Sequence, residues 1–281
     1  MRGLRLLTAA GLLALGGCVQ PALDGRNYVE PLGSALASAN PTAYSTGLDC
    51  LGRTLGPARD DTVFAVGEIA DYTGKDEYYS GRPITQGAAL MLISALDKAG
   101  LRQVERFDTA VAEAELQYAN NKLLGDEDGG APYREILAGS IPGSDVFFVG
   151  GVTELNFNLF SGSADALIGP AEIGGRLYVM NVGVDLRLVA TRTLEIVDVV
   201  SFQQQVYGRE LSAGFFEFLS DDDVLDIGVG DRSQEPMQRA VRAIIERAAL
   251  ELVAGLYDLN VEGCLPETRT AAATAAREPS T

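Results

Sequence analysis

Residues 160–179 read FSGSADALIGPAEIGGRLYV and contain two alternating arms that meet at Gly169-Pro170. In each arm, small or apolar side chains occupy most of the positions on one side of an extended strand, and polar side chains are concentrated on the other. Each arm has about nine residues, close to the roughly 9–11 that a transmembrane β-strand needs. The stretch therefore predicts a β-hairpin long enough to cross a membrane. By periodicity alone, half-buried strands of a soluble protein remain the better explanation.

Residues 202–219 form a second alternating segment, which is less regular in its first arm. In the return arm, Phe216 and Phe218 alternate with Phe215 and Glu217. Aromatic side chains near the ends of such arms are typical of membrane interfaces. The segment predicts a second hairpin of the same kind.

Elsewhere the pattern predicts a mixture of helices and strands. Strands are expected at residues 62–69, at 146–157 and in a hairpin over 180–200, and helices at 85–98, 109–124, 133–138 and 236–257. The last helix has a stripe of apolar side chains, namely Met237, Val241, Ile244, Ala248, Leu252 and Leu256. The acidic run Asp221-Asp222-Asp223 is interpreted as the start of a short helix, because carboxylates are favourable at a helix N-terminus.

The N-terminus is typical of a bacterial lipoprotein signal. Arg2 and Arg5 precede a short apolar run that ends in Leu15-Gly16-Gly17-Cys18. The run is far shorter than the ~20 residues of a spanning helix. We expect residues 1–17 to be cleaved and Cys18 to be lipidated, and Val19 after the cysteine favours the outer membrane. An ordinary secretory signal with a chance cysteine is the alternative.

Composition excludes several classes of function. The 281 residues are 47% hydrophobic, enough for a sizeable core, and carry 22 basic against 39 acidic side chains. Removal of the signal leaves 20 basic residues, so nucleic acid is an unsuitable partner. The chain has no histidine and no tryptophan, which excludes Ser-His-Asp and Cys-His catalysis and most zinc sites. The acidic stretch at 126–130 lacks the ligands of an EF-hand and is interpreted as a solvated loop. We expect no catalytic residues, metal or cofactor.

Two cysteines remain once Cys18 is assigned to lipid. In an oxidising compartment, Cys50 and Cys264 favour a disulfide that joins the N-terminal strap to the end of the last helix. Two free buried thiols are the alternative.

Five motifs together resemble the CsgG/HfaB family, which comprises curli-secretion lipoproteins and their holdfast-anchor relatives. The motifs are DYTGK at 71–75, TQGA at 85–88, NVGVDLRLV at 181–189, AGFFEF at 213–218 and QEP at 234–236. The resemblance implies an α+β fold in which a periplasmic α/β part carries two transmembrane β-hairpins per subunit, and many subunits share one barrel. Four strands from each of about nine copies would give about 36 strands, the size of the largest barrels known.

The resemblance also implies a domain plan. A lipidated strap would occupy residues 18–57, the CsgG-like domain 58–265, with hairpins at about 160–179 and 202–219, and a disordered tail 266–281. The loop after the first strand would narrow the pore, through Tyr78 and Tyr79. Lumen-facing positions would be Asp165, Glu172, Arg176 and Glu217, and lipid-facing positions Ile168, Ile173, Leu177, Phe216 and Phe218.

The function that follows is an outer-membrane lipoprotein forming an ungated diffusion channel. It would secrete or anchor unfolded amyloid-like or adhesin subunits of the curli or holdfast type, with periplasmic accessory factors as partners. The alternative is a non-spanning periplasmic α/β lipoprotein that binds and regulates an envelope enzyme.

Overall fold

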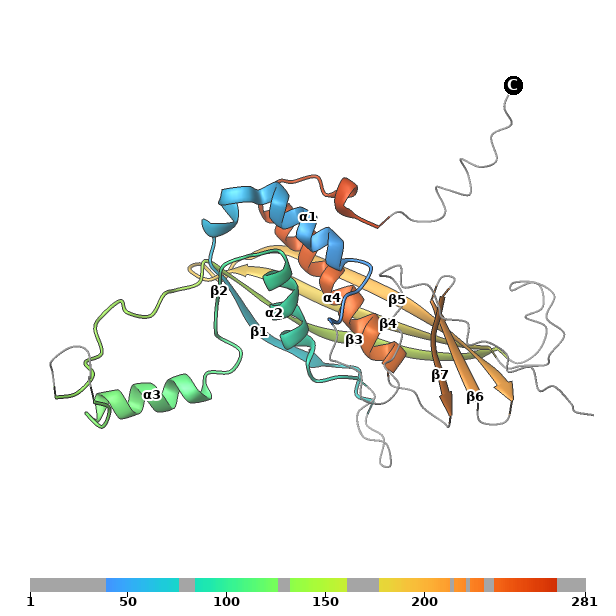
Figure 1. Ribbon diagram of the computed structural model, residues 1–281, viewed down its shortest axis with the longest axis horizontal. Coiled ribbons are helices and arrows are strands. Elements are labelled where there is room, and N and C mark those ends of the chain that lie inside the picture. The colour runs from blue at the N-terminus through green and yellow to red at the C-terminus, as the bar shows by residue number, and fades with distance from the viewer. Residues whose placement is uncertain are drawn as a thin grey trace, which may run out of the picture. The chain divides into compact units, whose positions relative to one another are not determined.

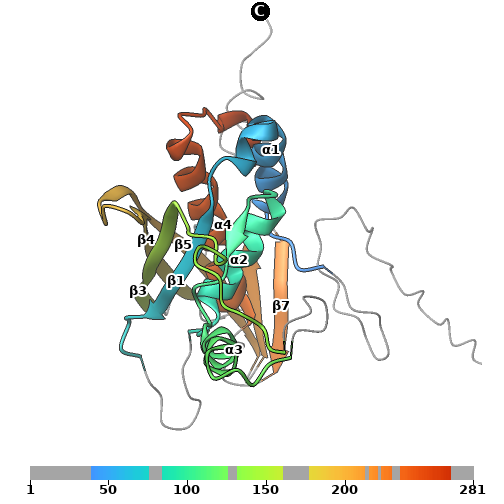
Figure 2. The ribbon, with the colours of Figure 1, turned by 90° about the vertical axis from the view of Figure 1, so that its left-hand side faces the viewer.

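A seven-stranded mixed sheet with helices on one face forms the core of the chain (Figures 1 and 2). The computed structural model describes residues 39–75, 84–125, 132–160, 177–212, 215–220, 223–229 and 235–266. Its strands are β1 (Phe64–Asp71), β2 (Gln103–Val104), β3 (Val146–Phe160), β4 (Leu177–Ala190), β5 (Ile196–Ser212), β6 (Phe215–Ser220) and β7 (Asp223–Val229). Its α-helices are α1 (Ser45–Leu55), α2 (Ala88–Lys98), α3 (Ala110–Asn120) and α4 (Glu235–Leu256), and two 3-10 helices lie at Gly56–Asp60 and Glu262–Cys264.

The strands follow the order β2-β1-β3-β4-β5-β6-β7 across the sheet. β1 runs parallel to β2 and β3, and every pair from β3 onwards is antiparallel. The parallel β1 and β2 are linked through α2, because a parallel connection needs a crossover. The antiparallel strands β3 to β7 follow one another along the chain, and the connections from β4 to β5, β5 to β6 and β6 to β7 are short.

The helices α1, α2 and α4 bury one face of this sheet. The predicted stripe of α4 is confirmed from Met237 to Leu252: its side chains are at most 4% exposed, and Leu256 at its end packs against the same core. On the sheet side, the rings of Phe64 and Phe148 stack with 6.1 Å between their centroids. The 3.6-residue apolar period was therefore sufficient to identify α4.

Three parts of the chain differ from the sequence-based expectation. Residues 45–55, which we assigned to the strap, form α1, and its Leu48 and Leu51 are fully buried. The helix expected at 133–138 is not formed; those residues are irregular and largely exposed. The acidic run ending in Asp223 leads into strand β7 and not into a helix. The period-two pattern of Leu225, Ile227 and Val229 outweighs the helix-start signal of the carboxylates.

A disulfide joins Cys50 in α1 to Cys264 after α4, with 5.6 Å between the Cα atoms. The two residues are 214 apart in sequence, so the bond ties the N-terminal helix to the C-terminal end of the domain.

Replacing both Cys50 and Cys264 by serine is expected to lower the free energy of unfolding by about 3–5 kcal/mol, because so long a closed loop strongly constrains the unfolded chain in the chain-entropy model. Chemical unfolding followed by circular dichroism would measure the difference. Maleimide labelling of the unfolded, unreduced wild-type chain supplies the control. Labelling of both cysteines there would contradict the bond.

Candidate functional site

The three long strands β3, β4 and β5 continue past the helix-covered core, and this extension is the candidate functional site. Among residues whose burial is described, the outermost buried ones along them are Leu155 in β3, Val179 and Met180 in β4, and Val206 in β5. Beyond that level the β3–β4 ladder runs on until Phe160 pairs with Leu177. The extension lies at the end of the sheet where β6 and β7 are added (Figure 1).

Both predicted hairpins begin as continuations of these strands. Phe160 and Leu177 are the ends of the first hairpin's two arms, and the residues between them lie outside the described part of the chain. In the second hairpin, β5 pairs with β6 from Tyr207 opposite Leu219 to Ser212 opposite Phe215. Its return arm is thus strand β6, and β7 adds a further antiparallel strand.

The extended part of the sheet has two edges. β1 stops pairing with β3 at Asp71 opposite Val152, so within the described residues β3 from Thr153 to Phe160 has a partner on its β4 side alone. At the other side, β7 pairs with β6 alone among the described strands. Unpaired backbone groups at such edges cannot remain open in lipid.

A row of amide side chains crosses the sheet at the base of the extension. Asn156 pairs in register with Asn181, and Asn181 pairs with Gln205. The Nδ2 group of Asn181 donates to Oε1 of the diagonal neighbour Gln203 at 2.9 Å. The neighbouring row, Leu155 and Val182, is buried beneath the helices. At this level one face of the sheet is polar and the other apolar.

The strand register also tests the predicted lipid and lumen sides. Residues directly opposite in an antiparallel ladder share a face of the sheet. Leu177 lies opposite Arg209, and Arg209 lies opposite Glu217. Leu177 and Glu217 therefore lie on one face of the sheet. The prediction that Leu177 faces lipid and Glu217 faces the lumen is wrong for one of these two residues. Leu177 is four residues from Ile173 and belongs to the same side of its arm, which means that the predicted sides of the first hairpin and of β6 cannot both hold.

Most of the other predicted site residues lie outside the described residues. These are Cys18, Tyr78, Tyr79, Asp165, Ile168, Glu172, Ile173 and Arg176. The backbones of Phe216 and Phe218 lie in β6.

A buried polar cluster, which the sequence analysis missed, holds the chain just before α1. Glu246 of α4 is 1% exposed, and its Oε2 accepts from the hydroxyls of Thr42 at 2.6 Å and Ser45 at 2.8 Å. Its Oε1 accepts from Lys98 Nζ at 2.5 Å, and Lys98 also donates to Ser45 Oγ at 3.0 Å. The cluster thus joins α2 and α4 to residues 42–45, which belong to the predicted strap. Its members are spread over some 200 residues, so no local pattern could have identified it.

The next residue of α4 connects the same segment to the second hairpin. The guanidinium of Arg247 lies 5.8 Å from the ring centroid of Tyr44 and 5.5 Å from that of Phe202. Phe202 is in β5, at the first residue of the predicted second hairpin. Cation–π contacts of this kind contribute about 0.5–2 kcal/mol. The start of the domain and the start of a hairpin arm are therefore held by one helix.

Replacing Glu246 by alanine is expected to lower the free energy of unfolding by about 2–4 kcal/mol, because Lys98, only 28% exposed, loses its charge partner and two hydroxyls lose their acceptor. Chemical unfolding would measure the change. Glu115→Ala is the matched control: Glu115 is half exposed and lies 3.7 Å from Arg134, so its loss should cost less than about 0.5 kcal/mol. Equal effects of the two substitutions would contradict the role of the cluster.

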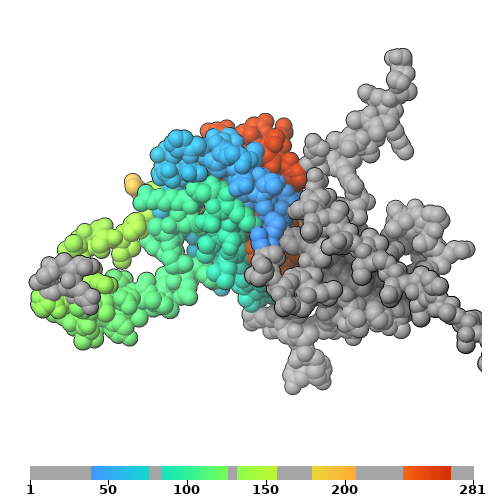
Figure 3. All heavy atoms as spheres, viewed as in Figure 1, coloured from blue at the N-terminus to red at the C-terminus, as the bar shows by residue number. Residues whose placement is uncertain are grey.

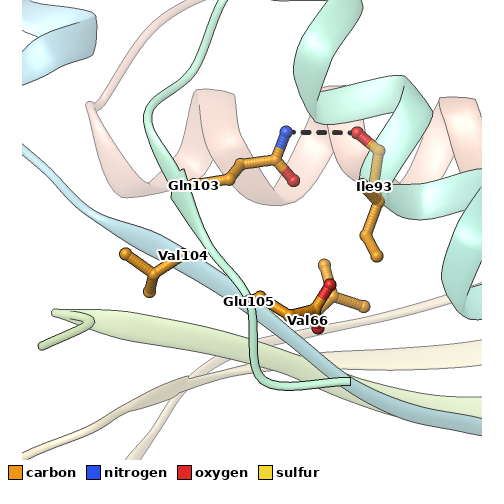
Figure 4. A pocket seen from close by; sticks show the side chains of 5 residues that line it. All are labelled: Val66, Ile93, Gln103, Val104 and Glu105. Atoms are coloured by element: carbon orange, nitrogen blue, oxygen red, sulfur yellow. Dashed lines mark hydrogen bonds between the residues drawn. The ribbon is translucent and has the colours of Figure 1, made fainter. Parts of the chain in front are cut away.

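A shallow hollow between β1, α2 and β2 offers no catalytic arrangement. It is lined by Val66, Ile93, Gln103, Val104 and Glu105 (Figure 4). Gln103 Nε2 donates to the carbonyl of Ile93 at 3.2 Å. The single carboxylate, Glu105, accepts from the backbone amides of Phe107 and Asp108 at 2.5 and 3.0 Å. The carboxylate of Glu105 therefore stabilises the backbone of Phe107 and Asp108.

Among the described residues, no group of three or more His, Cys, Asp or Glu side chains is placed to hold a metal ion. A search of the described helices found none with the length and apolar character to cross a membrane.

Comparison with known proteins gives consistent relatives. HfaB of Caulobacter vibrioides, which is named a transcription activator protein, is 50% identical over 280 residues, covering 93% of this chain and 82% of HfaB. The curli production assembly/transport component CsgG of Salmonella typhimurium is 24% identical over 271 residues, covering 91% of each chain. The PelC dodecamer of Paraburkholderia phytofirmans is 12% identical with a TM-score of 0.27, covering 70% of this chain and 89% of PelC, too distant to support an argument. Residues 52–279 match the family described as curli production assembly/transport component CsgG. The chain therefore belongs to the CsgG family.

Proposed function

We propose that this protein is an outer-membrane lipoprotein that assembles into an oligomeric, ungated channel for unfolded protein subunits. The observation that carries the proposal is the continuation of the paired strands β3, β4 and β5 beyond the helix-covered core, into both alternating segments. A family of assembly and transport components is consistent with this role. Cys18 would carry the lipid, and the helix-covered part of the chain would lie in the periplasm.

The two edges of the extended sheet support a shared barrel. One subunit alone would place unpaired edges in lipid, whereas a ring of copies can pair each β3 edge with the next subunit and leave none open. About nine copies, each contributing the four arms of the two predicted hairpins, would make a barrel of about 36 strands, and β7 would be a fifth strand outside that count. The hairpins would therefore insert only as a closed ring.

The pore would be narrowed and charged by residues from two places. Tyr78 and Tyr79 would form the constriction, where amphipathic rings can contact a passing chain without binding it tightly. Asp165, Glu172 and Arg176 would line the lumen above it and set its charge. Ile168, Ile173 and Leu177 would face lipid.

The transported or anchored subunits would be amyloid-like or adhesin proteins of the curli or holdfast type, delivered with periplasmic accessory factors. We do not extend the transcription name of HfaB to this chain, because 22 basic against 39 acidic residues is unsuited to phosphate binding. The Cys50–Cys264 bond also favours an oxidising compartment.

Mild detergent extraction from outer membranes, followed by negative-stain electron microscopy, tests the proposal. Rings with a central hole, and stepwise conductance when they are added to a planar bilayer, are the expected result. Compact monomers without conductance would overturn it and favour the periplasmic regulator of an envelope enzyme.

A further inference from the structure

Two apolar surfaces are left uncovered in the described part of the chain. Of the fourteen large apolar side chains exposed there, eight lie in the segment 105–145 and five on or beside the sheet face that the helices leave open. We call the first the α3 arm, with Phe107, Val111, Leu116, Tyr118, Leu123, Ile136, Leu137 and Ile141 exposed. The second, the open face, includes Tyr72, Leu194, Ile196, Val197 and Val199. Concentration of exposed apolar side chains in two places indicates contact surfaces.

The α3 arm is organised although little packs on it. Arg106 Nη2 donates to the carbonyl of Pro142 at 2.7 Å and closes its base. Within α3, the described residues include one buried side chain, Ala119. Figures 1 and 3 show the helix standing apart from α1, α2 and α4. A helix with so little cover gains most of its stability from a partner.

One side of α3 has the composition of a contact stripe. Val111, Glu115 and Tyr118 follow the i, i+4, i+7 spacing and so lie on one face of the helix. Val111 is 73% and Tyr118 48% exposed. Between them, the carboxylate of Glu115 has a loose 3.7 Å contact with the well-exposed Arg134, which contributes little. The stripe is apolar with one available negative charge.

The open face presents the complementary arrangement. Val149, Arg187 and Val199 pair in register and form one row across β3, β4 and β5. Arg187 has no hydrogen bond or ion pair to any other described residue. Two glycines flatten the surface: a Cβ at Gly67 would meet Val149, and one at Gly151 would meet the Tyr72 ring. The row is apolar and flat, with one positive charge at its centre that is paired with none of the other described residues.

We propose that the α3 arm of one copy of this protein docks on the open face of the next copy, with Val111 and Tyr118 against the row of Val149 and Val199, and Glu115 paired with Arg187. The inference rests on the proposed ring and specifies its contact outside the membrane. The arm and the face are different surfaces of one chain, so their contact is head-to-tail. Head-to-tail contacts close into rings when the rotation allows, whereas self-complementary contacts stop at a dimer. In Figure 2, α3 lies apart from β4 and β5 of its own chain.

Two surface variants of the full chain, expressed separately and then together with different affinity tags, test this contact. Val111→Asp disables the arm and Val199→Asp disables the face. Each alone should lose rings and elute as monomers, with subunit affinity lowered about tenfold or more. When the two variants are coexpressed, the intact open face of Val111→Asp and the intact α3 arm of Val199→Asp should form one contact. Pull-down and light scattering should then show 1:1 mixed dimers. Leu90→Asp, at an exposed leucine outside both surfaces, is the matched control and should keep rings.

Three outcomes would overturn the inference. Rings of wild-type size from either variant would mean that its surface is not a subunit contact, and the channel proposal would stand. Monomers from each variant without mixed dimers would mean that the two surfaces do not meet each other. Homodimers of Val199→Asp would indicate an arm-to-arm contact. Monomeric wild-type protein would instead contradict the channel proposal itself.

A charge exchange tests the central pair. Glu115→Arg and Arg187→Glu should each weaken ring assembly, and the double variant in one chain should restore it, because every contact then pairs an arginine with a glutamate again. Absence of restoration, with both single variants defective, would remove Glu115 and Arg187 as partners. Far-ultraviolet circular dichroism of each variant separates loss of assembly from loss of folding.

Discussion

An arginine in place of Ile173 is expected to abolish insertion of the oligomer into the outer membrane. Ile173 lies in the middle of the second arm of the first predicted hairpin, on its predicted lipid side. Arginine on the lipid face near the bilayer centre costs about 2–4 kcal/mol, and every subunit of the ring would carry it. Over about nine copies, the cost would reach roughly 20–35 kcal/mol per barrel. Membrane fractionation and conductance measurements would measure the loss of insertion.

Glu172→Arg is the matched control, since it places the same side chain one residue away on the predicted lumen side. That variant should insert and alter only the ion selectivity of the pore. Normal insertion of Ile173→Arg would contradict the transmembrane hairpin. Equal failure of both variants would indicate a general intolerance of the segment to arginine and contradict the predicted sides.

Replacing Cys18 by serine is expected to remove the lipid and release the protein from its anchor. Each buried methylene contributes about 0.8 kcal/mol, and stable attachment needs more than one acyl chain. Without the anchor, subunits would no longer be concentrated at the membrane, and rings should fall to a small fraction of the wild-type amount. Metabolic labelling with an alkyne fatty acid and membrane fractionation would measure both effects.

The control is Cys50→Ser, which removes the disulfide and leaves Cys18 available for lipid. It should be labelled as the wild type is, although less stable. Fatty-acid labelling of Cys18→Ser, or its full retention in rings, would contradict the assignment of Cys18.

The helices α2 and α4 and most strands could be predicted because their signals are local. In α4 the apolar side chains from Met237 to Leu252 recur at helical spacing, and α2 shows the same kind of face. Polar and apolar residues alternate with a period of two from Glu154 to Leu159 in β3, and from Asn181 to Leu188 in β4 every second residue is apolar. Where two local signals competed, the sequence-based assignment was wrong: the carboxylates that end in Asp223 suggested a helix, while the following apolar alternation produced β7.

The lipid and lumen sides of the hairpins could not be predicted from such local signals. Alternation within one arm separates two faces and leaves open which face of the next strand aligns with them. The sequence analysis therefore placed Leu177 and Glu217 on opposite sides, although the register through Arg209 puts them in one row. A shift of one residue exchanges every side chain, so only the pairing of strands fixes the sides.

The sequence by itself determined the α+β class, the two alternating segments, the candidate lipidation site and the family, because period, composition and short motifs are properties of neighbouring residues. Tertiary structure alone decided which distant groups meet. It brought Thr42, Ser45 and Lys98 to the buried Glu246, placed Arg247 between Tyr44 and Phe202, and left the α3 arm and the open face uncovered. Burial and contact depend on how separate elements pack, and no spacing along the chain contains that information.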